Sequence, residues 1–116
     1  MDIETLREYC LRHKGVKEEF PFGNNTLVFK VSGKIFLLVS LDQAPLQFNA
    51  KCDPEQAEAL RERYPAVLPG YHMNKKHWNT IVVDGSLGEK MLREIIDDSY
   101  RLVLQSLPLS ARKKLL

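Results

Sequence analysis

Three strand-like segments follow one another with only short turns between them, and this arrangement constrains the fold more than any other feature of the sequence. Apolar and polar residues alternate over 26–31 and over 46–51, so each of these segments has one face suited to burial. The segment 35–41 between them is apolar throughout, which favours a central strand covered on much of both sides. A Ser-Gly-Lys turn at 32–34 joins the first two strands. The sequence therefore predicts an antiparallel sheet.

Helical spacing of apolar residues predicts three helices, at about 2–14, 53–64 and 86–107. The first two begin with an aspartate at the N-cap, and the third begins with a Ser-x-x-Glu capping box and carries a wide apolar stripe. A further strand at about 77–83 precedes the third helix. The element order α-β-β-β-α-β-α predicts a two-layer α+β fold, in which helices pack on one face of an antiparallel sheet.

The length of the chain suits one core and is too short for two, because it has 116 residues, of which 44% are hydrophobic. We therefore expect residues 1–116 to form a single domain. The acidic start lacks the basic residues and apolar run of a signal peptide, and no apolar stretch approaches the roughly 20 residues that span a bilayer. The two cysteines lie far apart and form no disulfide pattern, which fits a reducing compartment. From these features together, the sequence predicts a soluble cytoplasmic protein without a membrane partner.

The most distinctive stretch of the sequence is 69–80, Pro-Gly-Tyr-His-Met-Asn-Lys-Lys-His-Trp-Asn-Thr. Other short motifs accompany it: Glu-Tyr-Cys at 8–10, Phe-Pro-Phe at 20–22, Lys-Cys-Asp-Pro-Glu at 51–55, Asp-Gly-Ser at 84–86 and Asp-Ser-Tyr at 98–100. In these motifs, over nearly its whole length, the chain resembles the MmcQ/YjbR-like family.

This resemblance implies a compact α+β fold, related in shape to secretion-chaperone-like domains, and a DNA-binding role as a "double wing" module. It brings no catalytic or ligand-binding residue that can be placed on this sequence. The overall charge does not decide the matter, because 17 basic and 15 acidic residues give a formal charge of only +2.

The clearest nucleic-acid signal is a cluster of basic and aromatic residues, in which Lys75 and Lys76 adjoin Trp78 and Tyr71 lies close by. Lysines neutralise phosphates and aromatic rings stack on bases, so this combination favours nucleic-acid binding. In the alternative interpretation, Trp78 anchors the sheet and the lysines are merely solvated. The predicted nucleic-acid-binding residues are Lys30, Lys34, Lys51, Lys75, Lys76 and Trp78, with Arg112, Lys113 and Lys114 of the basic tail as further candidates.

The strand at 77–83 also predicts an open sheet face. If Ile81 and Val83 face the helices, the alternation places Trp78, Thr80 and Val82 on the opposite face. By the same alternation, that face carries Lys30, Gln47, Asn49 and Lys51 from the other strands. A protein partner or a small ligand could use such a face equally well, because an aromatic ring among polar residues is a common hot spot.

Metal-binding and nucleophilic side chains are too scattered to indicate a site. His72 and His77 are five positions apart and have only two remote additional ligands, so no metal site is predicted. Cys10 lies on an apolar stripe, and Cys52 adjoins Asp53, whose carboxylate opposes activation of the thiol. The short motifs of nucleotide-binding proteins, serine hydrolases and metalloproteases are absent, and we predict neither catalytic residues nor a cofactor.

Three hypotheses of function follow from the sequence. The first is a weak, largely sequence-tolerant DNA-binding module that uses the basic and aromatic residues. The second is a protein-interaction or chaperone-like module that uses the open sheet face. The third is a small-molecule-binding or catalytic pocket near Tyr71, His72 and His77.

Overall fold

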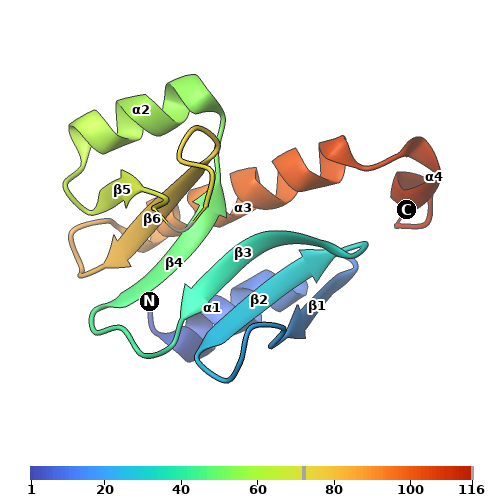
Figure 1. Cartoon of the computed structure of the whole chain (residues 1–116), viewed down its shortest axis with the longest axis horizontal. Helices are drawn as coiled ribbons and strands as arrows, with labels where there is room; N and C mark the ends of the chain where they lie inside the picture. The colour runs from blue at the N-terminus through green and yellow to red at the C-terminus, as the bar shows by residue number, and fades with distance from the viewer. Residues whose placement is uncertain (72, 116) are drawn as a thin grey trace.

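The computed structural model describes residues 1–71 and 73–115 and shows an open six-stranded sheet in which neighbouring strands are antiparallel (Figure 1). The strand order across the sheet is β1-β2-β3-β4-β6-β5. In chain order the strands are β1 (Val16–Glu19), β2 (Thr26–Val31), β3 (Lys34–Ser40), β4 (Leu46–Lys51), β5 (Val67–Pro69) and β6 (Trp78–Val83).

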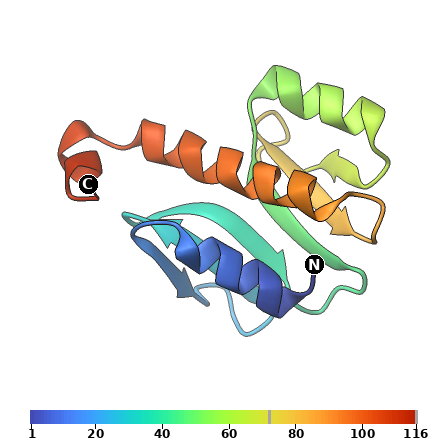
Figure 2. The same ribbon diagram turned by 180° about the vertical axis from the view of Figure 1, so that it is seen from behind.

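The helices leave one face of this sheet open. α1 (Ile3–Arg12) and α3 (Glu89–Ser106) lie behind the sheet in Figure 1 and in front of it in Figure 2. α2 (Pro54–Arg63) lies near β5 at one edge, and α4 (Leu109–Lys113) follows the end of α3 that extends beyond the sheet. This arrangement confirms the predicted α+β class. None of the helices in the described residues is long and apolar enough to cross a bilayer.

Every predicted element is present, and the structure adds β1, β5 and α4. β1 and β5 are the two edge strands, and they have only four and three residues. Segments this short do not produce a clear alternation in the sequence. β5 also ends at Pro69, whose missing N–H suits an edge.

Two of the three predicted helix starts are confirmed. The carboxylate of Asp2 accepts a hydrogen bond from the backbone N–H of Thr5 (2.8 Å), and that of Asp53 accepts one from the N–H of Gln56 (3.4 Å). Each aspartate thus satisfies one of the N–H groups that a helix start leaves unpaired.

The predicted start of the third helix at Ser86 is wrong. Gly88 occupies the N-cap of α3, and Ser86 lies in the preceding turn. Both the backbone N–H and the hydroxyl of Ser86 donate to Asp84 Oδ1, at 2.9 and 2.6 Å. The aspartate therefore competes for the serine that the capping box required, as is common in turns that begin with Asp.

The main core lies between the sheet and the helices α1 and α3. Its most deeply buried members include Leu6, Cys10, Phe29, Phe36, Phe48, Ile81, Leu92, Ile96 and Val103. A polar contact joins the two helices beside this core. Asp97 of α3 accepts a hydrogen bond from Tyr9 Oη (2.7 Å) and lies 2.7 Å from Nε2 of His13. Burial, and secondly the Asp97 carboxylate, raise the pKa of Tyr9 to about 12.

A buried serine on α3 enters the sheet between β3 and β4. The hydroxyl of Ser99 donates to the carbonyl of Phe36 and accepts from the backbone N–H of Lys51 (2.8 Å). The register of the two strands, with Leu37 opposite Ala50, would otherwise bring these two backbone groups together. Ser99 thus replaces one rung of the ladder, and beyond it β3 and β4 separate (Figure 1).

Candidate functional site

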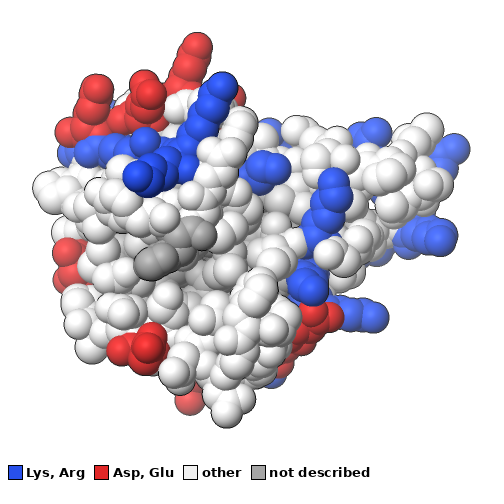
Figure 3. Space-filling model, in the orientation of Figure 1, with Lys and Arg blue, Asp and Glu red and all other residues white. Residues whose placement is uncertain are grey.

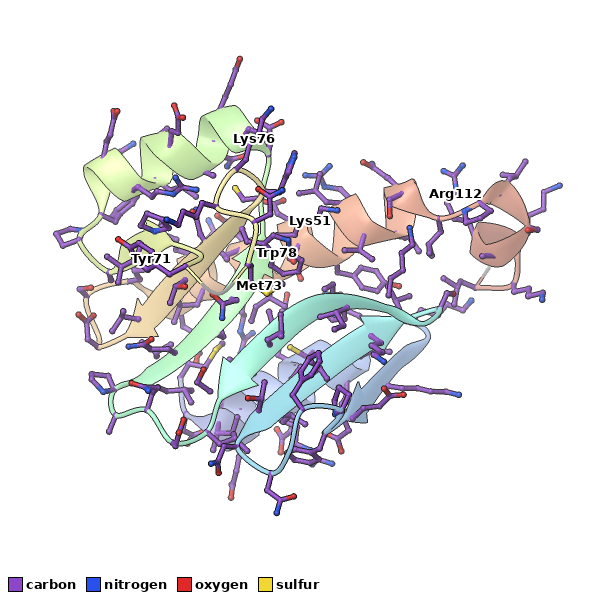
Figure 4. All side chains as sticks on the ribbon, viewed as in Figure 1. Lys51, Tyr71, Met73, Lys76, Trp78 and Arg112 are labelled. Carbon is purple, nitrogen blue, oxygen red and sulfur yellow. The ribbon has the colours of Figure 1, made fainter. Side chains whose placement is uncertain are left out.

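The side chains opposite the helices form what we call the open face. The register of β4 and β6 places Lys51 beside Trp78 and Asn49 beside Thr80, and these side chains share one face, as the sequence predicted. The same face continues through Leu38 of β3, which is the partner of Asn49. Figure 4 shows Lys51 and Trp78 near each other at the end of β4 and the start of β6.

Two loops border the open face and carry exposed aromatic rings. The loop 20–25, between β1 and β2, presents Phe20 and Phe22, whose exposed fractions are 51% and 66%. The loop 70–77, between β5 and β6, presents Tyr71, which is 62% exposed. These rings are candidates for contacts with a ligand or partner.

A hollow of about 370 Å³ lies between these two loops. Its lining is Phe22 from one loop, Met73 from the other, and Thr26, Ile35, Leu38, Ser40 and Asn49 from the strands between them. Val28 and Leu38 are buried on the open face without belonging to the main core, so the sheet is apolar in this region. Among the described lining residues, Thr26, Ser40 and Asn49 carry polar groups, and Asn49 Oδ1 already accepts a hydrogen bond from Thr80 Oγ1 (2.5 Å).

Hydrogen bonds hold the described part of the loop 70–77 in place. The backbone N–H of Gly70 donates to the carbonyl of Trp78 (2.9 Å), and Asn74 Oδ1 accepts from the N–H of Lys76 (2.9 Å). Arg61 of α2 donates to the side chain of Asn79 (2.7 Å) and also to the carbonyl of Lys75. The loop is thus attached to both β6 and α2.

Gly70 is needed for the close approach of this loop to β6. A Cβ atom at this position would lie 2.9 Å from both the Cβ and the carbonyl oxygen of Trp78, and backbone atoms cannot easily move away. We expect Gly70→Ala to lower the free energy of unfolding by about 1–3 kcal/mol, as overpacking usually does. Chemical denaturation would measure this loss.

The control for this prediction is Gly88→Ala, because a Cβ at Gly88 would have nothing within 4 Å. Gly88 is the N-cap of α3, so its replacement should cost less than about 1 kcal/mol. Equal losses for the two variants would contradict the role assigned to Gly70.

Lysines of the predicted site gather at one end of the open face. Lys51 ends β4, and Lys75 and Lys76 lie in the loop just before β6, separated from its first residue, Trp78, by His77. Lys75 Nζ lies 5.2 Å from the centre of the Tyr71 ring, within the range of a cation–π interaction. Figure 3 shows Lys and Arg along the upper and right-hand parts of this face, while Asp and Glu lie over α2 and the lower part.

The remaining predicted cations are less favourably placed. Lys34 begins β3 at the same end of the sheet, but the separation of β3 from β4 sets it apart from Lys51. Lys30 is paired with Glu19, with 2.7 Å between Nζ and Oε2. Arg112 lies on α4, towards the far right of Figure 4. Lys76 borders a shallow pocket that also contains two glutamates of α2.

Trp78 is half-buried and is neither part of the main core nor packed against it. This placement argues against the alternative interpretation of Trp78 as a core anchor. His72 lies outside the described residues, so its predicted role cannot be placed. The hollow is lined by Met73 of this loop rather than by Tyr71 or His77.

Neither cysteine has the properties of a nucleophile. Burial raises the pKa of Cys10 to about 12. Burial, and secondly the carboxylates of Asp98 and Asp53, raise the pKa of Cys52 to about 11. Thiols with such pKa values are almost entirely protonated at neutral pH and react slowly. No group of three metal-binding side chains occurs among residues 1–71 and 73–115.

Comparison with known proteins assigns the chain to a family. Residues 11–102 match the family model described as YjbR. The chain belongs to the YjbR family. It is 38% identical to Escherichia coli O157:H7 YbdF, over 96% of this chain and 91% of the relative, and 32% identical to YjbR of Escherichia coli K12, over 99% and 98%. It is also 41% identical to Bacillus subtilis YyaQ, over 79% of this chain and 72% of the relative.

Solved structures of similar proteins support the fold of this YjbR-family chain. The crystal structure of a Deinococcus radiodurans protein with a DUF419 domain has a TM-score of 0.92 and 39% identity, and the match covers 97% of this chain and 86% of that one. A Pseudomonas syringae crystal structure has a TM-score of 0.76 and 28% identity, over 88% and 98%. These similarities establish the family and the fold.

Proposed function

We propose that this protein binds nucleic acid through the basic end of the open face. The observation that carries the proposal is the grouping of Lys51, Lys75 and Lys76 beside Trp78 and Tyr71, at the meeting point of two strands and one loop. Cations there neutralise phosphates, and the two rings offer surfaces on which bases stack.

The surrounding charges suit a weak interaction that reads little sequence. The glutamates of α2 lie beside Lys76 and oppose the approach of a phosphate from that side. Lysine is a flexible point charge that holds the phosphate backbone of a nucleic acid in position without contacting the edges of the bases. The protein therefore discriminates poorly between sequences.

The test is the salt dependence of binding to a short duplex. Each phosphate contact contributes a slope of about −0.9 to the plot of log affinity against log salt concentration. We expect the double variant Lys75→Ala, Lys76→Ala to flatten this slope by about two units and to weaken binding to duplexes of all sequences by the same factor. Fluorescence anisotropy at several salt concentrations measures both effects.

The matched control is the double variant Lys14→Ala, Lys90→Ala. Both lysines are exposed and lie at the end of α1 and on α3, which cover the opposite face of the sheet. This variant loses the same two charges and should retain the slope of the unsubstituted protein. If both double variants flatten the slope equally, the effect comes from net charge and the proposed site is wrong.

A second candidate function is a protein-interaction module on the same face. The observation that favours it is the exposure of Phe20, Phe22 and Tyr71, because exposed aromatic rings are typical of protein interfaces. Binding of this kind would depend little on salt and would not respond to the lysine substitutions, so the same titrations separate the two functions.

A further inference from the structure

We infer that the hollow between the loops 20–25 and 70–77 binds one unpaired base of a single-stranded nucleic acid. The inference rests on the proposed function and adds the form of nucleic acid that the site prefers. Phe22 and Met73 stand on opposite loops, and Leu38 and Ser40 lie on the strand between them. The base occupies this space while the phosphates remain at the basic end.

The lining of the hollow matches the two kinds of surface that a base presents. The flat faces of a base are apolar and stack on rings and other apolar groups, which Phe22, Met73 and Leu38 supply. Its edge carries hydrogen-bond donors and acceptors, for which Ser40 and Asn49 supply partners.

Asn49 is the best placed of these polar partners. Its Oδ1 is occupied by Thr80, while its Nδ2 has no hydrogen-bond partner among the described residues. The amide nitrogen therefore remains a donor for an acceptor on a base edge. This arrangement fixes the orientation of the amide before any ligand binds.

The hollow adjoins the basic end of the open face. Met73 belongs to the same loop as Lys75, and Asn49 precedes Lys51 by two positions on the same face of β4. A nucleotide with its base beside Met73 and Asn49 therefore has cations within reach of its phosphates (Figure 4). None of the described lining residues is charged, so the charges lie around the hollow and not inside it.

The apolar hollow with cations beside it favours a single-stranded nucleic acid over a duplex or an apolar peptide. The bases of a duplex are stacked and paired, so their faces cannot enter the hollow without being unstacked. An apolar peptide would fill the hollow but carries no negative charge to interact with the neighbouring lysines. A single strand uses both the apolar hollow and the cations.

The experiment compares Phe22→Ala with Phe20→Ala. Both rings lie on the same loop and are exposed, so their removal should leave the fold intact, but only Phe22 lines the hollow. We expect Phe22→Ala to weaken binding of single-stranded oligothymidylate about tenfold, the loss typical of one stacking contact. Binding of a duplex of equal length, and the salt slope, should not change. Phe20→Ala should leave all three quantities unchanged.

Other outcomes would overturn the inference. It fails if both phenylalanine variants weaken binding equally, if the duplex is affected as strongly as the single strand, or if thymidine monophosphate binds as tightly as the oligonucleotide. It also fails if an apolar dye whose binding depends on Phe22 is not displaced by oligothymidylate, since the hollow would then serve a protein or another apolar ligand.

The proposed function can fail separately. If the unsubstituted protein binds neither single strand nor duplex, nucleic-acid binding itself is wrong. If the lysine double variant flattens the salt slope while Phe22→Ala has no effect, nucleic-acid binding stands and only the base-binding hollow is wrong.

Discussion

A chain that ends at Gly85 should lose cooperative unfolding altogether, because it lacks α3. This helix contributes Leu92, Ile96 and Val103 to the core and covers the central strands of the sheet. Burial of each such side chain contributes roughly 1.5–3 kcal/mol. Whole domains are stable by only about 5–15 kcal/mol, so the loss of the helix removes a large part of the total.

Thermal and chemical unfolding followed by circular dichroism would test this expectation. The control is a chain that ends at Leu107, which keeps all of α3 and removes only Pro108, α4 and the residues after it. The control should still unfold cooperatively. A chain ending at Gly85 that melts sharply, at the midpoint of the full chain, would show that residues 1–85 hold a core of their own.

Ser99→Ala should lower the free energy of unfolding more than any of the single substitutions proposed above. The methyl group leaves the backbone N–H of Lys51 and the carbonyl of Phe36 without the partner that the hydroxyl provides. A buried polar group without a partner costs about 1–3 kcal/mol, and this substitution leaves two such groups without their partner. Urea unfolding would measure the decrease in the free energy of unfolding.

Ser106→Ala is the matched control for Ser99→Ala. It makes the same chemical change in the same helix, but Ser106 is exposed and its hydroxyl donates within α3, to the carbonyl of Val103 (2.6 Å). A surface substitution of this kind should change the free energy of unfolding by no more than about 0.5 kcal/mol. If Ser99→Ala is as mild as Ser106→Ala, the serine does not hold the two strands.

The sequence predicted those parts of the fold in which a periodic pattern runs for six residues or more. β2, β4 and β6 are six residues long, and β3 was recognised instead by a continuous apolar run of similar length. The edge strands β1 and β5 were not predicted, because short segments paired on one side have little apolar surface to reveal them. The start of α3 was misplaced because a capping box and an Asp-Gly-Ser turn share the same serine.

The candidate site was predicted only in part, for a different reason. Alternation along a strand shows which side chains share a face, so the placement of Lys51 and Trp78 on one face could be anticipated, whereas their direct pairing could not. The hollow depends on two loops far apart in the sequence, which bring Phe22 towards Met73. No local pattern carries that information, although two phenylalanines around a proline just after a charged strand are an unusual signal.

The insertion of Ser99 between β3 and β4 also shortens the pairing that joins the two halves of the sheet. The pairing of β3 with β4 covers only 37–40 with 47–50 and is shorter than the pairing on either side of it. This short pairing is therefore a seam between two panels of the sheet, β1-β2-β3 and β4-β6-β5. α3 bridges the seam because it packs on both β3 and β4. One loop of the hollow belongs to each panel. A small rotation about the seam would change the width of the hollow without breaking either panel.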